Sequence, residues 1–236
     1  LQKLDQEDEK SLSLVEKVVE TCLEGQLQTL ERLDISFDSF IHESKFVLNS
    51  DVEAIVEKLK KSDKCYIENG AFKLETDTEE DLTFLRSDGT TLYTTRDIAY
   101  HIDKIKRSDR IINILGEDHE LQSKQLLSAL NLLDEKPNIT NVFYSYVTLP
   151  EGSMSTREGK AVNVDELLDE AVKRAKEEVK SRSRDRNREI ENKKNWEEKS
   201  SEIVGVGSVR FDIISRKPRK PIEFNWEAAL DFEGGS

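Results

Sequence analysis

Residues 82–101 read LTFLRSDGTTLYTTRDIAYH, and the rest of the chain can be organised around this stretch. Its first four residues alternate as in a β-strand, and residues 87–89, Ser-Asp-Gly, have the composition of a turn. Ile98, Ile102 and Ile105 then recur at the spacing of a helix. The stretch therefore predicts a strand, a turn and a short extended segment that leads into a helix.

Five consecutive residues with polar side chains stand where this helix is expected to begin: Tyr93, Thr94, Thr95, Arg96 and Asp97. A purely structural explanation would make Thr95 the N-cap and would let Asp97 favour the first turn. That explanation accounts for two of the five residues. We therefore regard the start of this helix as a candidate ligand site.

The composition excludes several classes of protein. With 236 residues, 36% of them hydrophobic and 36% charged, the chain can form one large or two small domains. No apolar run approaches the about 20 residues of a membrane span, and the N-terminus lacks the pattern of a signal peptide. We expect a soluble, cytoplasmic protein without membrane contact, and, since the chain does not begin with Met, a piece of a longer one.

Cysteine and charge give weaker indications. Cys22 and Cys65 lie far apart and are accompanied by only three histidines, so we expect neither a metal site nor a disulfide framework. The net charge of −13 argues against nucleic acid, but residues 173–194 and 216–220 are locally basic. These basic segments are either solvated surfaces or contacts to nucleic acid.

The first 80 residues predict an α+β region. An apolar stripe at helical spacing predicts a long helix packed on a core: Leu12, Val15, Val19, Leu23, Leu27 and Leu30. Ser50 and Glu53 form a capping box that opens a second helix. Asn69-Gly70, between short β-type runs at residues 65–68 and 71–74, is a strong hairpin signal.

After residue 101 the pattern becomes strand–helix–strand–helix, with strands at residues 110–115 and 142–147 and helices at 121–133 and from Asn163 onward. Short connections between such elements imply a parallel sheet with right-handed crossovers. Ligands bind beyond the carboxyl ends of such strands. Those ends are followed here by residues 116–119 and by the loop 148–160.

The loop 148–160 has the composition of a phosphate-binding segment, because two glycines give its backbone freedom and several side chains can donate hydrogen bonds. It is not a Walker P-loop, since six residues separate Gly152 from Gly159 and Ala161 follows the lysine. Residues 205–210, GVGSVR, lack the third glycine of a dinucleotide fingerprint. We interpret them as close packing within a helix.

Four stretches together carry a family resemblance: TLYTTRDIA at 91–99, LGEDH at 115–119, MSTREGK at 154–160 and FNWEAALDFEG at 224–234. In order and spacing they resemble class I aminoacyl-tRNA synthetases of the arginine-specific, archaeal type, from residue 34 onward. The implied fold is α/β, the second half of a Rossmann-like nucleotide-binding parallel sheet with an α+β insertion and a helical C-terminal extension. The implied regions are 1–80 (insertion), 81–180 (catalytic half, with signature loop 148–160) and 181–236 (helical extension toward an anticodon-binding domain).

The resemblance also implies the substrates and the roles of individual residues. The substrates would be L-arginine, ATP with Mg²⁺, and tRNA(Arg), and the full-length enzyme would be a monomer. Tyr93, Asp97 and His119 would bind arginine, and Asp97 suits this role because a carboxylate can accept two parallel hydrogen bonds from a guanidinium. His119 and the signature loop would bind ATP through Met154, Ser155, Thr156, Arg157 and Lys160. Of these, Arg157 and Lys160 would be catalytic.

The sequence departs from the family pattern at two places. Thr156 and Arg157 follow Met-Ser where other class I loops carry a lysine, and Glu158 stands where a basic residue is usual. No His-x-Gly-His signature occurs in the 236 residues. We therefore expect a fragment of an arginine–tRNA ligase that forms no arginyl-adenylate by itself.

Two alternatives remain open. A non-catalytic RNA-binding module is favoured by the basic stretch 180–188, whose candidate RNA contacts are Arg182, Arg184 and Arg186. A regulatory fragment derived from a synthetase would keep the apolar stripes but could lose the polar site. Because Tyr93 and Asp97 stand at the family's positions, we rank the enzyme fragment first.

Overall fold

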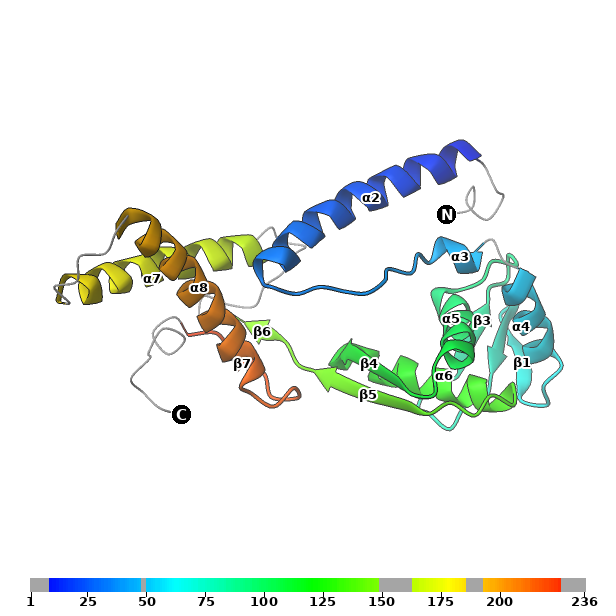
Figure 1. Ribbon diagram of the computed structural model, residues 1–236. Helices are drawn as coiled ribbons and strands as arrows, with labels where there is room; N and C mark the ends of the chain where they lie inside the picture. The colour runs from blue at the N-terminus through cyan, green and yellow to red at the C-terminus, as the bar shows by residue number, and fades with distance from the viewer. Residues whose placement is uncertain (1–8, 48–49, 149–162, 186–192, 226–236) are drawn as a thin grey trace. The chain divides into compact units, whose positions relative to one another are not determined.

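A computed structural model describes residues 9–47, 50–148, 163–185 and 193–225 (Figure 1). The chain divides into two compact units. The first comprises Leu1–Val19 and Asp38–Tyr144, and the second comprises Glu20–Phe37 and Ser145–Ser236. The assignment of functional regions at residues 1–80, 81–180 and 181–236 stays a prediction.

Within the first unit, the segment Asp38–Tyr144 begins with two helices, α3 (Ser44–Val47) and α4 (Ser50–Lys60), and an antiparallel sheet. The sheet has the order β1 (Cys65–Glu68), β2 (Ala71–Leu74) and β3 (Leu82–Leu85). The predicted hairpin is confirmed: Glu68 faces Ala71, and Asn69 and Gly70 have φ of 50° and 80°, as a type I′ turn requires. The helix predicted from Ser50 is confirmed as well.

A parallel strand pair follows in the same unit. The order is α5 (Tyr93–Arg107), β4 (Ile111–Gly116), the short 3₁₀ helix η1 (Glu117–His119), α6 (Glu120–Leu132) and β5 (Ile139–Tyr144). β4 and β5 pair in parallel from Ile111 opposite Ile139 to Gly116 opposite Tyr144, which confirms the predicted crossover. The strand predicted at residues 142–147 begins earlier and ends at Tyr144.

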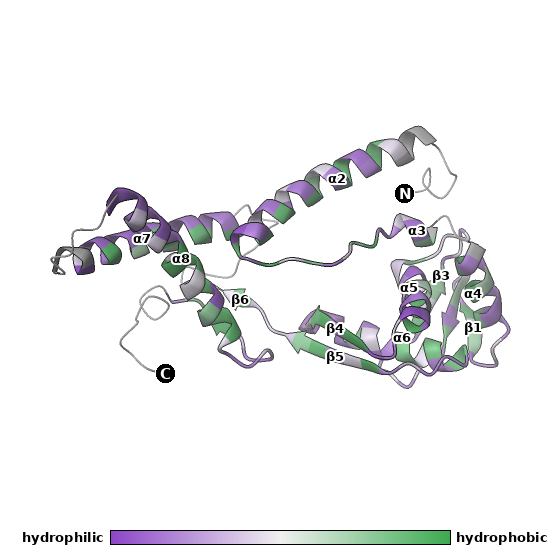
Figure 2. Ribbon diagram, in the orientation of Figure 1, coloured by the Kyte–Doolittle hydropathy of each residue, from purple (hydrophilic) through white to green (hydrophobic). Residues whose placement is uncertain are grey.

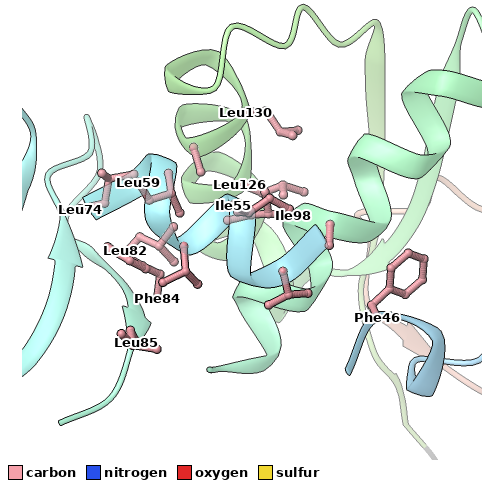
Figure 3. Close-up of a cluster of buried hydrophobic side chains, with 14 residues drawn as sticks. Phe46, Ile55, Leu59, Leu74, Leu82, Phe84, Leu85, Ile98, Leu126 and Leu130 are labelled. Carbon is pink, nitrogen blue, oxygen red and sulfur yellow. The ribbon is translucent and has the colours of Figure 1, made fainter. Parts of the chain in front are cut away.

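The hydrophobic core of this unit is formed by α4, β3, α5 and α6 (Figure 3). Phe84, Ile98 and Leu130 are each fully buried in it. The proposed capping role of Thr95 is wrong. The N-cap position of α5 is Leu92, and Thr95 is a buried residue inside the helix whose hydroxyl donates to the Phe84 carbonyl at 2.5 Å.

The second unit is built on the helices α7 (Val164–Asp185) and α8 (Lys193–Ile214), with the short parallel strands β6 (Val147–Thr148) and β7 (Ile222–Glu223). The amide N–H of Asn163 donates to the Glu166 carboxylate at 3.2 Å at the predicted start of α7. Gly205 packs closely against α7, because a Cβ atom there would lie 2.7 Å from the Val172 backbone. This confirms that residues 205–210 are a helical packing segment.

Helix α2 (Glu9–Arg32) confirms the long helix predicted near the N-terminus, and hydrophobic and hydrophilic bands alternate along it (Figure 2). The expectation that its apolar stripe is buried is wrong at Val15, Val19 and Leu27, which are 42%, 42% and 37% exposed, whereas Leu23 and Leu30 are half-buried. Periodicity shows that one face is apolar, but not which element covers it. Near the end of α2, Arg32 binds Asp169 of α7 at 2.7 Å and Glu202 of α8 at 2.8 Å.

Candidate functional site

The start of α5 is held against β3 by two threonine hydroxyls. Thr94 donates to the Thr83 carbonyl at 3.3 Å, and Thr95 donates to the Phe84 carbonyl. These bonds fix the first turn of the helix. Tyr93 and Asp97, one turn apart on the same helix face, both keep accessible side chains.

The positive neighbour of Asp97 is engaged elsewhere. The Arg96 guanidinium donates through Nε to Glu43 Oε1 at 2.6 Å and through a second nitrogen to the Thr91 carbonyl at 3.5 Å. Within the described part of the chain, no lysine or arginine forms an ion pair with Asp97, whose carboxylate is 47% exposed. The carboxylate can therefore accept hydrogen bonds from a cationic ligand.

Tyr93 is linked to His119 through Gln122. Nδ1 of His119 lies 2.7 Å from Oε1 of Gln122, and the Gln122 amide nitrogen donates to the Tyr93 hydroxyl. His119 ends η1 directly after the carboxyl end of β4, where a parallel sheet is expected to bind its ligand. The structure thus connects two of the three residues predicted to bind arginine.

Sequence reasoning missed Gln122. Glutamine carries no charge and belongs to none of the four recognised motifs, so nothing marked it as functional. Its position three residues after His119 was a usable signal, because residues three apart lie on the same face of a helix and a helix was expected from residue 121.

One further cation, Lys104, lies on the same helix as Asp97 and is partly buried. Lys104, two turns along α5 from Asp97, donates through Nζ to Asn113 Oδ1 at 3.0 Å. Burial lowers the pKa of this lysine, while the negative charge of Asp97 acts in the opposite direction. The ammonium lies 4.4 Å from the centre of the Tyr100 ring, which compensates part of the lost hydration.

Several predicted site residues lie outside the described residues: Met154, Ser155, Thr156, Arg157, Lys160 and Arg186. Arg182 lies on α7 and pairs with Glu178 at 2.6 Å, and Arg184 belongs to the last turns of the same helix. Across residues 9–47, 50–148, 163–185 and 193–225 there is no group of three or more His, Cys, Asp or Glu placed to hold a metal ion. The described helices also include none long and apolar enough to cross a membrane.

The arrangement is suited to a ligand with a planar, cationic, hydrogen-bonding end. Such a ligand would meet an anionic acceptor at Asp97 and a phenolic hydroxyl at Tyr93. A guanidinium presents donors in a rigid planar fork, which a carboxylate matches with two parallel bonds, whereas an ammonium does not.

Comparison with known proteins shows which family the chain belongs to. Residues 1–226 match the family described as tRNA synthetases class I (R), catalytic domain. Curated relatives called arginine–tRNA ligase include those of Halorubrum lacusprofundi (45% identical over 100% of this chain and 40% of the relative) and Haloarcula marismortui (50% identical over 88% of this chain and 36% of the relative). The chain thus spans 40% or less of the length of these two relatives.

Solved structures share the fold. The arginyl-tRNA synthetase of Thermus thermophilus matches 98% of the chain, with 47% of its own length covered, a TM-score of 0.73 and 23% identity. That of Plasmodium falciparum also matches 98%, with 39% of its length covered, a TM-score of 0.81 and 16% identity. At these identities the comparison shows the fold alone, and the fold is that of a class I catalytic domain.

Proposed function

Because the chain belongs to the family of class I tRNA synthetases (R), catalytic domain, we propose that it carries the arginine-binding part of an arginine–tRNA ligase. In the reaction of that enzyme, the arginine carboxylate attacks the α-phosphate of ATP and pyrophosphate leaves. The terminal hydroxyl of tRNA(Arg) then takes the arginyl group from the adenylate. Mg²⁺ would accompany the ATP phosphates.

The proposal gives the residues separate tasks. Tyr93 and Asp97 bind the guanidinium of arginine, and His119 lies beside the bound arginine or its adenylate. Arg157 and Lys160 stabilise the charge that grows on the phosphate oxygens. No protein nucleophile is needed, so catalysis is mainly orientation and electrostatic stabilisation.

One observation carries the assignment to arginine. Asp97 presents an accessible carboxylate on the first turns of α5, while the adjacent Arg96 is paired with Glu43 at 2.6 Å. The guanidinium of Arg96 is therefore bound to Glu43 and not to the Asp97 carboxylate. The position that it would have occupied is left to a substrate guanidinium.

A second observation supports a catalytic domain that includes further chain. On β4 the apolar side chains of Ile112 and Ile114 are 56% and 63% exposed, and on β5 Tyr144 is 51% exposed. The sheet of a nucleotide-binding domain is covered by helices on both faces. We propose that the rest of the domain covers these residues, and that the 236 residues alone are inactive because they lack the His-x-Gly-His signature.

The test is Asp97→Asn in the full-length protein that contains these residues. The change keeps the shape of the side chain but removes the negative partner of a largely desolvated guanidinium, at a cost of about 2 to 5 kcal/mol. The KM for arginine in arginine-dependent ATP–pyrophosphate exchange should rise by about 30-fold or more. The KM for ATP should change little.

The control is Asp109→Asn, which removes one negative charge from an exposed position after the end of α5. This variant should behave as the parent. If Asp97→Asn kept the arginine KM within about threefold of the parent, a difference below 1 kcal/mol, the assignment of Asp97 would be refuted.

A further inference from the structure

A line of polar contacts leads from β5 through β4 and His101 to Asp97. Asn113 on β4 and Asn141 on β5 face each other in the parallel pair. Asn113 reaches His101, a residue of α5 that is only 4% exposed. His101 in turn contacts Asp97 one helical turn earlier, so the sheet is connected through a buried histidine to the exposed site.

The orientation of the Asn113 amide follows from its neighbours. The ammonium of Lys104 can only donate, and it lies 3.0 Å from Asn113 Oδ1, which identifies that atom as the oxygen. Nδ2 must then be the nitrogen. Its two hydrogens are directed to Asn141 Oδ1 at 2.9 Å and to His101 Nε2 at 3.2 Å.

The tautomer of His101 follows in the same way. Because Nε2 faces an N–H donor, it must be the acceptor, and the proton of the neutral ring must be on Nδ1. Nδ1 lies 2.9 Å from the Asp97 carbonyl oxygen and 3.1 Å from Asp97 Oδ1, both of which are acceptors. Each contact from Lys104 to Asp97 therefore pairs a donor with an acceptor.

We propose that His101 is a positioning residue that holds the Asp97 carboxylate in the orientation that binds the substrate guanidinium. This inference rests on the proposed function, because it takes Asp97 to be the partner of the guanidinium. The Nδ1–H that donates to the Asp97 carbonyl also lies 3.1 Å from Oδ1, so it attracts this oxygen and restrains the side chain while leaving its negative charge available. Among the described residues no other group binds this carboxylate, so Oδ2 and the second lone pair of Oδ1 can accept from the ligand.

The contact with His101 would preorganise the Asp97 side chain for arginine binding. An exposed aspartate on a helix samples several rotamers, and binding must select one of them. The buried imidazole selects that rotamer before arginine arrives. Tyr93 is restrained in a similar way by Gln122, so each of the two predicted guanidinium contacts is held by a second side chain.

Two substitutions of His101 separate positioning from packing. The amide of asparagine can place a donor where Nδ1 lies, whereas the amide of glutamine reaches the position of Nε2. In the full-length protein, His101→Gln removes the donor beside the charged Asp97 carboxylate and should raise the KM for arginine by roughly tenfold. His101→Asn should retain most of the parental arginine KM.

The readout is the KM for arginine and for ATP in pyrophosphate exchange, with the urea unfolding midpoint of each variant. His42→Gln, at an exposed histidine, is the matched control and should leave all three values unchanged. Equal arginine KM values for the Gln and Asn variants of His101 would overturn the inference, whatever their stability. If Asp97→Asn also left the arginine KM unchanged, the proposed function itself would fail.

Discussion

Gly205 allows a sharp test of how the second unit is packed. It lies inside α8, and a Cβ atom there would be 2.7 Å from both Cα and N of Val172 and 2.9 Å from the carbonyl carbon of Ala171. All three are backbone atoms of α7, so no side-chain rotation can relieve the contact. Gly205→Ala should therefore force α7 and α8 apart.

Two opposing effects determine how much Gly205→Ala changes the free energy of unfolding. Alanine is the better helix former, which stabilises the variant by about 0.5 to 1 kcal/mol. Overpacking of a close interface costs about 1 to 3 kcal/mol. The clash should dominate, and we expect Gly205→Ala to lower the free energy of unfolding by about 1 to 2 kcal/mol.

Gly207 provides the matched control, because it lies two residues further along α8 and a Cβ there would meet no atom within 4 Å. Gly207→Ala should gain only the helix propensity and become more stable by about 0.5 to 1 kcal/mol. The assay is urea unfolding followed by far-ultraviolet circular dichroism. Equal stabilisation by the two alanines would refute the packing of Gly205 against α7.

Two further predictions concern acid stability and RNA binding. The hydrogen bond from the Tyr66 hydroxyl at 2.6 Å lowers the pKa of Asp81. The stability that the ionised Asp81 contributes is therefore present at neutral pH and is lost as the pH falls through this lowered pKa. Asp81→Asn should flatten the decline of the unfolding free energy below about pH 4, and an unaltered decline would contradict this prediction. In the full-length protein, replacing Arg182, Arg184 and Arg186 by Gln should weaken tRNA binding and reduce its salt dependence by about one unit per lost phosphate contact. An unchanged salt slope would return these arginines to the role of a solvated surface.

Local signals predicted most elements of the fold correctly. Asn69-Gly70 defined the hairpin because its two positive φ values are set by the turn residues themselves. The strand–helix–strand order after Arg110 implied the parallel pairing of β4 with β5. Such features depend on residues that are close in sequence, and this explains why they could be predicted.

Features that depend on tertiary contacts were harder to predict. The strand containing Phe84 pairs with the hairpin through β2, a partner that its own sequence does not specify. Thr95 resembled an N-cap, but burial under β3 gives its hydroxyl a different acceptor. Strand β5 ends at Tyr144, before the predicted residue 147, and the amide of the next residue, Ser145, donates to the Pro218 carbonyl at 2.8 Å, a contact between residues far apart in sequence.

Only part of the candidate site could be predicted, because some of its residues are brought together by tertiary contacts. Motif reasoning selected Tyr93, Asp97 and His119, which carry recognisable chemistry. It did not select Gln122 or His101, since their roles appear only when α6 and β4 are placed beside α5. Residues that support a binding group are set by the fold, whereas the binding group itself is often visible in the sequence.

ATP–pyrophosphate exchange with each amino acid in turn, with tRNA present, tests whether this protein activates arginine. The full-length protein should catalyse exchange with arginine and with none of the others, lysine included, since an ammonium cannot form two parallel bonds to Asp97. The 236 residues alone should give none, and exchange should return when the remainder of the catalytic domain is supplied in trans. Exchange driven by another amino acid, or by the 236 residues alone, would contradict the account.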